Sequence, residues 1–183
     1  PLAEILVAQE MMKGDIFEIA KPFVDSGKGV NSVEEALSGA MDIIAEDISD
    51  NAAVRKTVRA LFYRHGTVVS KALTQEDSVY RQYYDFKEPV SKIAGHRVLA
   101  INRGEKEKIL KVQIDMPDEL VISRIKSHIV RNEKSVTAEY MEKAAEDSYK
   151  RLIKPSIENE VRNELTQSAE EQAIKVFGEN LRN

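Results

Sequence analysis

The stretch Ser32–Ile48, SVEEALSGAMDIIAEDI, decides the fold class of this chain. Ser32 and Glu35 have the spacing of a capping box, in which the hydroxyl accepts from a free helix amide and the glutamate reaches back. The apolar residues of the stretch recur with the helical period, at Val33, Leu37, Ala40, Met41, Ile44 and Ile48. This pattern predicts a helix that buries one face.

Similar signals extend along the rest of the chain. Asp15 and Glu18 repeat the capping-box spacing, and Pro155 suits the first turn of a long last helix that runs to about Gly178. Further helices are predicted for Ala52 to about Leu73, His96–Asn102, Leu120–Val130 and Thr137–Lys154. Only Leu110–Met116 alternates as a strand does. We therefore expect a mainly α, multi-helical domain with a long C-terminal helix and one short strand or hairpin near residues 110–116.

Composition limits the kinds of protein that this chain can be. Its 183 residues, 42% hydrophobic and 32% charged, suit one helical region over residues 1–183, and a division into residues 1–74 and 75–183 stays open. There is no cysteine, and the three histidines lie far apart, so we expect no metal and no cofactor. No apolar run is long enough to cross a bilayer. We expect a cytoplasmic protein without a membrane or small-molecule partner. Because the chain begins at Pro1 rather than methionine, we also expect a piece of a longer protein.

Charge is unevenly distributed along the chain. The net charge of −4 combines 3 Lys/Arg against 11 Asp/Glu in residues 1–50 with 13 against 6 in residues 51–112 and 11 against 14 in residues 113–183. The middle segment therefore carries a balance of +7 between acidic flanks. A basic middle segment favours an anionic partner such as nucleic acid. Packing of the segments against one another would explain the same pattern.

The basic residues of the predicted helix after Ala52 are the first candidate site. Arg and Lys side chains at helical spacing neutralise phosphates and release counterions. The alternative is a solvated helix face that pairs with acidic residues of the same protein. The candidates are Arg55, Lys56, Arg59, Arg64 and Lys71.

A second candidate site lies within Tyr84–Val112, YDFKEPVSKIAGHRVLAINRGEKEKILKV, which is rich in particular polar residue types. Arg97 and Arg103 could contact phosphates, with Asn102 near a backbone or base edge. In a structural interpretation, Gly104 has a positive φ and caps the helix that contains His96, while Arg97 or Arg103 pairs with Glu105, Glu107 or a carboxylate of another helix. Both interpretations stay open.

Several segments resemble the Tex family of bacterial transcription accessory proteins, over the whole chain. The most specific is HRVLAINRGEKE at residues 96–107. The others are PLAEILVAQE at 1–10, EEALSGAMDIIAEDISDN at 34–51, VRKTVRALFYRHG at 54–66 and FGENLRN at 177–183. The chain departs from the family at Met41, where an arginine is usual, and at Lys108, where a glycine often follows.

The resemblance implies a helical region with a helix-turn-helix-like element, upstream of an RNase H-like domain, helix-hairpin-helix motifs and an OB-fold RNA-binding domain. Tex-like proteins bind nucleic acid and act in transcription, and their RNase H-like domain is generally regarded as inactive. The chain itself contains no G-x-S-x-G motif, no P-loop and no carboxylate cluster at metal-ligand spacing. We therefore expect no enzyme, but a helical scaffold that assists nucleic-acid binding. The main affinity for nucleic acid is expected in the downstream domains. The alternative is a module that docks RNA polymerase or other transcription factors through the acidic first segment.

Overall fold

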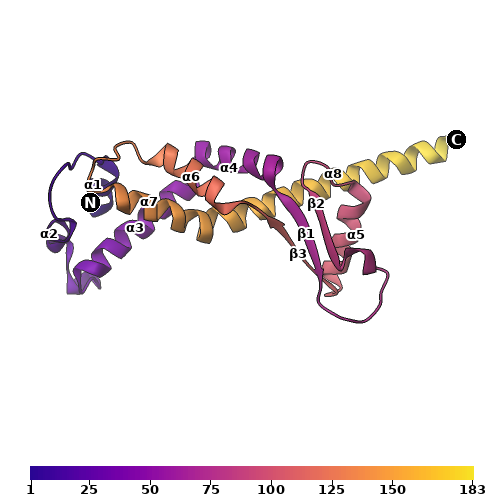
Figure 1. The fold of residues 1–183 in the computed structure, drawn as a ribbon, viewed down its shortest axis with the longest axis horizontal. Coiled ribbons are helices and arrows are strands. Elements are labelled where there is room, and N and C mark those ends of the chain that lie inside the picture. The colour runs from indigo at the N-terminus through magenta and orange to yellow at the C-terminus, as the bar shows by residue number, and fades with distance from the viewer. The chain divides into compact units, whose positions relative to one another are not determined.

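A computed structural model describes all 183 residues and divides them into two compact units. Unit 1 comprises residues 1–57 and 118–155, and unit 2 comprises residues 58–117 and 156–183. The boundary between residues 74 and 75 that the sequence left open lies inside unit 2. The mainly α class and the long C-terminal helix are confirmed (Figure 1).

Unit 1 is entirely helical apart from its loops. It contains α1 (Leu2–Ala8), α2 (Ile16–Ala20), α3 (Val33–Asp50), the first part of α4 (Ala52–His65), α6 (Asp118–Ile129) and α7 (Ala138–Ser148). Three short helical turns complete it, at Lys21–Phe23, Ser26–Lys28 and Tyr149–Ile153. Its main packing is α3 against α7, with α1 and α6 at their sides.

The capping box predicted the start of α3 correctly. The hydroxyl of Ser32 accepts from the Glu35 amide at 3.1 Å, while the Glu35 carboxylate accepts from the Asn31 amide at 2.7 Å. The predicted stripe faces the core, since Leu37, Ala40, Ile44 and Ile48 are all buried. α3 is therefore an amphipathic helix whose apolar face supports unit 1.

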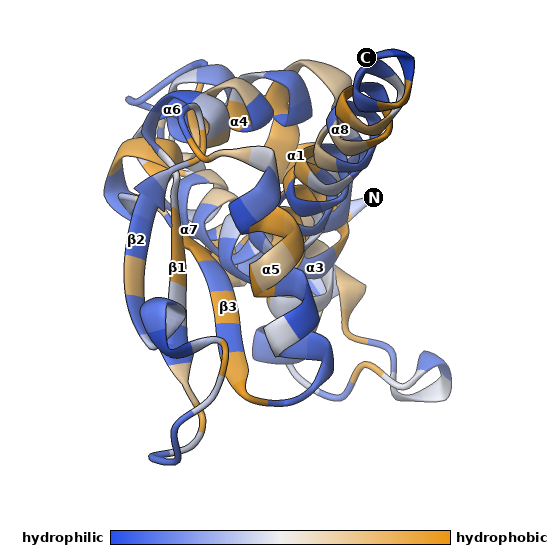
Figure 2. Cartoon of the chain, turned by 90° about the vertical axis from the view of Figure 1, so that its right-hand side faces the viewer, coloured by the Kyte–Doolittle hydropathy of each residue, from blue (hydrophilic) through white to orange (hydrophobic).

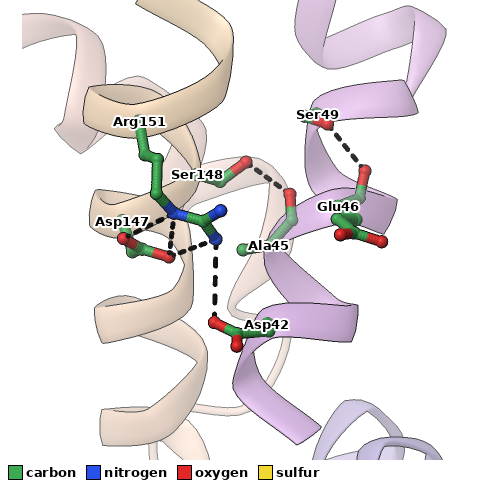
Figure 3. A network of polar contacts seen from close by, with 7 residues as sticks. All are labelled: Asp42, Ala45, Glu46, Ser49, Asp147, Ser148 and Arg151. Carbon is green, nitrogen blue, oxygen red and sulfur yellow. Dashed lines mark hydrogen bonds and ion pairs between the residues drawn. The ribbon is translucent and has the colours of Figure 1, made fainter. Parts of the chain in front are cut away.

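Polar contacts fix α3 against the chain from α7 onward (Figure 3). The buried hydroxyl of Ser148 donates to the Ala45 carbonyl at 2.6 Å. Arg151 pairs with Asp147 at 2.9 Å and lies 3.7 Å from Asp42 of α3. A buried hydroxyl needs such a partner, because an unsatisfied polar group in the core costs about 1–3 kcal/mol.

Unit 2 combines the end of α4 with a small sheet and two helices. It contains β1 (Thr67–Ala72), the turn Arg81–Tyr83, β2 (Asp85–Pro89), α5 (Gly95–Lys106), β3 (Leu110–Asp115) and most of α8 (Lys154–Arg182). The sheet is antiparallel with the order β2–β1–β3, and α5 lies beside it (Figure 2). Residues of α4, β1, α5, β3 and α8 form the core of unit 2, among them Phe62, Val68, Ile101, Ile114 and Ile157.

The sequence predicted one of the three strands. β3 lies where the alternation placed a strand, but the helix predicted to about Leu73 ends at His65, and β1 and β2 are corrections. β1 is the central strand, and Val68, Val69 and Ser70 are all buried, so no alternation marks it. β2 is a short, polar edge strand that ends in Pro89. Its few residues and its proline give no recognisable strand pattern in the sequence.

The predicted cap at Gly104 is wrong. α5 continues through Gly104 to Lys106, and the residue with a positive φ of 62° is Lys108. The Ile109 amide donates to the Gly104 carbonyl and the Lys108 amide to the Glu105 carbonyl, at 2.9 and 3.0 Å, as in a helix end with a left-handed residue. Lys108 therefore occupies the position that favours glycine, and it is the position where the family pattern often has one.

Gly104 instead allows close packing. A Cβ atom there would lie 2.5 Å from Cδ1 of Leu110 and 3.2 Å from Cδ1 of Tyr80, and both residues are buried. The helix can approach β3 and the turn before β2 only because this position carries no side chain.

Two substitutions at this end of α5 should change stability in opposite directions. Gly104→Ala should lower the free energy of unfolding by about 1–3 kcal/mol, because the added methyl group overpacks the contact with Leu110. Lys108→Gly should raise it by about 1 kcal/mol, because glycine adopts the left-handed conformation without steric cost. Denaturant unfolding of each variant measures both effects.

Gly39→Ala is the matched control for the first substitution. Gly39 lies inside α3, is exposed and has no atom within 4 Å of an added Cβ. Alanine should therefore stabilise α3 by up to about 1 kcal/mol. Equal effects of alanine at Gly39 and at Gly104 would contradict the packing role of Gly104.

Candidate nucleic-acid interface

The basic residues of α4 do not form a single free surface. Arg59 donates to Oε2 of Glu160 on α8 from Nε at 3.0 Å and from Nη2 at 2.7 Å, while the Tyr63 hydroxyl donates to Glu164. Burial and the hydrogen bond to Glu164 raise the pKa of Tyr63 to about 12. Arg59 and Tyr63 are four residues apart and thus share one helix face. That face is used for packing against α8 within unit 2.

The other candidates on α4 and β1 have different surroundings. Arg55 donates to the Ser49 carbonyl at 3.2 Å and helps to hold the end of α3 in unit 1. Lys56, Arg64 and Lys71 are exposed and form no ion pair. Arg64 follows Arg59 by five residues, which places it about 140° around the helix. In unit 2, Arg64 and Lys71 are therefore the cations of this group that are available to a partner.

The polar cluster on α5 is largely structural. Glu105 forms a two-point pair with Arg162 of α8, at 2.7 and 2.9 Å. Asn102 accepts from the same guanidinium at 3.1 Å and donates to the Thr166 hydroxyl at 2.8 Å. The partner of Glu105 is thus a residue of the last helix, rather than Arg97 or Arg103. A planar guanidinium that satisfies two side chains at once fixes the orientation of α5 on α8.

The two arginines of this region differ from each other. Arg97 pairs with Glu88 of β2 at 3.3 Å, and its guanidinium lies 5.7 Å from the ring centroid of Phe86. Arg97 therefore ties α5 to the edge strand, with a cation–π contribution. Arg103 is exposed and forms no ion pair, so it remains available. His96 is exposed at the start of α5.

An apolar groove of about 700 Å³ lies between the start of α5 and the second half of α8. Its walls are mainly apolar, with His96 and Gln172 among the polar residues. Val176 and Phe177 of α8 are 49% and 66% exposed, so the stripe that is buried at Ile157 and Val161 emerges at the surface here. The apolar lining includes Ile93, Leu99, Ala169, Ala173, Val176 and Phe177.

Comparison with known proteins gives the family of this chain. A family model described as Tex central region-like matches residues 13–177. The chain belongs to the Tex central region-like family. It is 46% identical over 167 residues to the uncharacterized protein YdcI of Bacillus subtilis, which covers 89% of the chain and 23% of YdcI.

Two further relatives carry names that describe a function. The chain is 27% identical over 190 residues to the transcriptional accessory protein Tex of Neisseria gonorrhoeae, covering 100% of the chain and 25% of that protein. It is 29% identical over 171 residues to the S1 RNA-binding domain-containing protein 1 of Pongo abelii, covering 85% of the chain and 17% of that protein. The chain thus spans about a quarter or less of the length of these relatives.

Neither a metal site nor a membrane span is found in this Tex-like region. No group of three or more His, Cys, Asp or Glu side chains is placed to hold a metal ion. None of the helices combines the length and apolarity needed to cross a bilayer.

Arg59 and Arg64 should separate stability from binding. Arg59→Ala should lower the free energy of unfolding by about 0.5–1 kcal/mol, because it removes a half-exposed pair with Glu160. Arg64→Ala, on the same helix but without a partner, should change it by less than about 0.5 kcal/mol. Denaturant unfolding of both variants compares the two residues.

The same variants should behave in the opposite way toward a polyanion such as heparin. Loss of Arg64 should weaken retention on a heparin column, whereas loss of Arg59 should not. A larger loss of stability in the Arg64 variant than in the Arg59 variant would contradict the assignment.

Proposed function

We propose that this chain is a non-enzymatic helical scaffold of a Tex-like transcription accessory protein, and that it assists nucleic-acid binding during transcription. The family membership and the names of two relatives, a transcriptional accessory protein and an S1 RNA-binding domain-containing protein, support a role close to nucleic acid. Because the chain spans a quarter or less of these relatives, most of the affinity is expected from other domains.

The observation that carries the proposal is the division among the cations of unit 2. Arg59, Arg97 and Arg162 are engaged in ion pairs that hold the fold together. Arg64, Lys71 and Arg103 are exposed and form no ion pair. Free, exposed cations can neutralise phosphates without loss of an internal contact. The basic balance of the middle segment thus leaves charge for an external anion.

Three further parts of the proposal rest on the sequence alone. The helix-turn-helix-like element implied by the family resemblance stays a prediction, as do the absence of enzymatic activity and of a cofactor. The candidate histidine, His96, is exposed at the rim of an apolar groove.

Binding of nucleic acid by the chain should depend steeply on salt. The logarithm of the affinity should fall linearly with the logarithm of the salt concentration, with a slope of about −0.9 for each duplex phosphate contacted. Fluorescence anisotropy with labelled single-stranded and duplex DNA and RNA, at several salt concentrations, measures the slope. No binding to any of the four probes at low salt would refute a nucleic-acid role for this chain.

A second candidate function is docking of a transcription protein such as RNA polymerase. The apolar groove of unit 2 favours it, since exposed apolar patches often mark protein interfaces. All eleven acidic side chains of residues 1–50 are also exposed, so the first segment could contribute an acidic surface in unit 1. Docking through the groove should be far less sensitive to salt than phosphate contacts.

Phe177→Asp should separate this function from nucleic-acid binding. A charge in the groove should weaken capture of purified RNA polymerase at least tenfold, because burial of an unpaired carboxylate is costly. Nucleic-acid affinity should change little. Val79→Asp is the control, since Val79 is 85% exposed in a loop outside the groove. Equal polymerase binding by wild type and the Phe177 variant would exclude docking through the groove.

A further inference from the structure

The pairing of the strands gathers three lysines on one face of the sheet. Lys71 of β1 lies directly opposite Lys111 of β3, and Lys87 of β2 lies opposite Val69, two residues along β1 from Lys71. Alternate residues of a strand point to the same side, so Lys71, Lys87 and Lys111 share one side of the sheet. We call this side the outer face; its residues are Thr67, Val69, Lys71, Asp85, Lys87, Pro89, Lys111, Gln113 and Asp115.

The opposite side of the sheet is committed to the core of unit 2. Val68, Leu110 and Ile114 point to it and are buried. Val68 and Val112 line a small cavity together with residues of α5 and α8, so these helices lie on the inner side. On the outer face, Lys71, Lys87 and Lys111 are all exposed. The three lysines are therefore surface residues, although Val69, which lies beside Lys71 and Lys87 on this face, is buried.

The charges of the outer face leave the lysines free. None of the three forms an ion pair or a side-chain hydrogen bond. Two acids share the face, Asp85 opposite Lys71 and Asp115 opposite Thr67, so they stand at diagonally opposite corners. The Asp115 carboxylate accepts from the Gln113 amide at 2.9 Å. The lysines thus form a band across all three strands between the two acidic corners.

Protection of the sheet edges accounts for part of this band. Lysines on edge strands prevent pairing with other chains, and β2 and β3 are the edges of this sheet. That explanation covers Lys87 and Lys111, but not Lys71, because β1 is the central strand and exposes no edge. The alignment of Lys71 with the two edge lysines needs a different reason.

We propose that the outer face of the sheet contacts the phosphate backbone of nucleic acid without reading its sequence. Neighbouring strands are about 4.8 Å apart, so the band is about 10 Å wide. Duplex DNA carries one charge per about 1.7 Å of its axis, so each lysine of the band can reach a phosphate. No aromatic residue lies on the outer face, which excludes stacking on bases as the source of affinity there. Thr67 and Gln113 add neutral donors between the charges.

This inference rests on the proposed function, and one experiment tests both separately. The variant with Lys71→Gln, Lys87→Gln and Lys111→Gln removes three charges from the outer face. The matched control, Lys13→Gln, Lys134→Gln and Lys175→Gln, removes three exposed lysines that lie elsewhere and form no ion pair. Wild type and both variants are titrated with duplex DNA, duplex RNA and single-stranded RNA at several salt concentrations, after circular dichroism has verified equal thermal midpoints.

The outer-face variant should bind each probe more weakly than wild type, and its salt slope should be smaller by about 2 to 3. The control should keep a slope within about 1 of the wild-type value. If wild type binds and the outer-face variant has the same affinity and salt slope, the outer-face site is overturned but the proposed function stays intact. Equal losses in both variants would also overturn it, in favour of a general effect of net charge. Failure of wild type to bind any probe would overturn both proposals.

Discussion

About two and a half turns of α8 hold unit 2 together through their polar side chains. Between residues 158 and 166, Glu158 accepts from the Ile114 amide of β3 at 2.7 Å, Glu160 pairs with Arg59 of α4, and Arg162 pairs with Glu105 of α5. Ile157 and Val161 supply the apolar side of the same stretch and are fully buried. Three elements far apart in the sequence are thus oriented by charged side chains of one helix. Removal of any partner would leave a half-buried charge without compensation, which costs more than an exposed pair gains.

This arrangement explains why the charge balance of a segment is a poor guide to a binding site. The basic middle of the chain contains cations that pair within the fold, Arg59 and Arg97, and others that form no ion pair, among them Arg64, Arg103 and Lys71. Arginine suits the first task because its planar fork satisfies two acceptors at once, as Arg162 does with Glu105 and Asn102. Lysine, a hydrated point charge on a flexible stem, suits contacts with a phosphate backbone. Residue type alone does not separate the two groups, since Arg64 and Arg103 are exposed and form no ion pair.

The helices of this chain could be predicted from sequence because their signals are local. The capping box at Ser32 and the stripe of α3 involve residues that are four or fewer positions apart, and Pro155 marks the first turn of α8. β1 could not be predicted, because its pairing along both edges comes from strands that lie about 14–22 and 38–48 residues further along the chain. The prediction that Gly104 caps α5 is wrong for a related reason. Its role is set by contacts with Leu110 and Tyr80 in three dimensions, while the helix end is formed by Lys108, a residue type rarely found with a positive φ.

The same limit applies to the candidate site. Charge along the helical stretch points to Lys71 but not to Lys87 and Lys111, because only the strand register aligns these two lysines with Lys71. Their signal in the sequence is the alternation of exposed polar residues in β2 and β3. That alternation can be interpreted only when both strands are known to flank β1.

The outer face and the apolar groove lie on different sides of unit 2, since α5 and α8 cover the inner side of the sheet and also form the groove. A phosphate backbone on the lysines and a protein in the groove would therefore not compete for the same atoms. By linkage, any effect of one ligand on the affinity for the other would have equal strength in both directions.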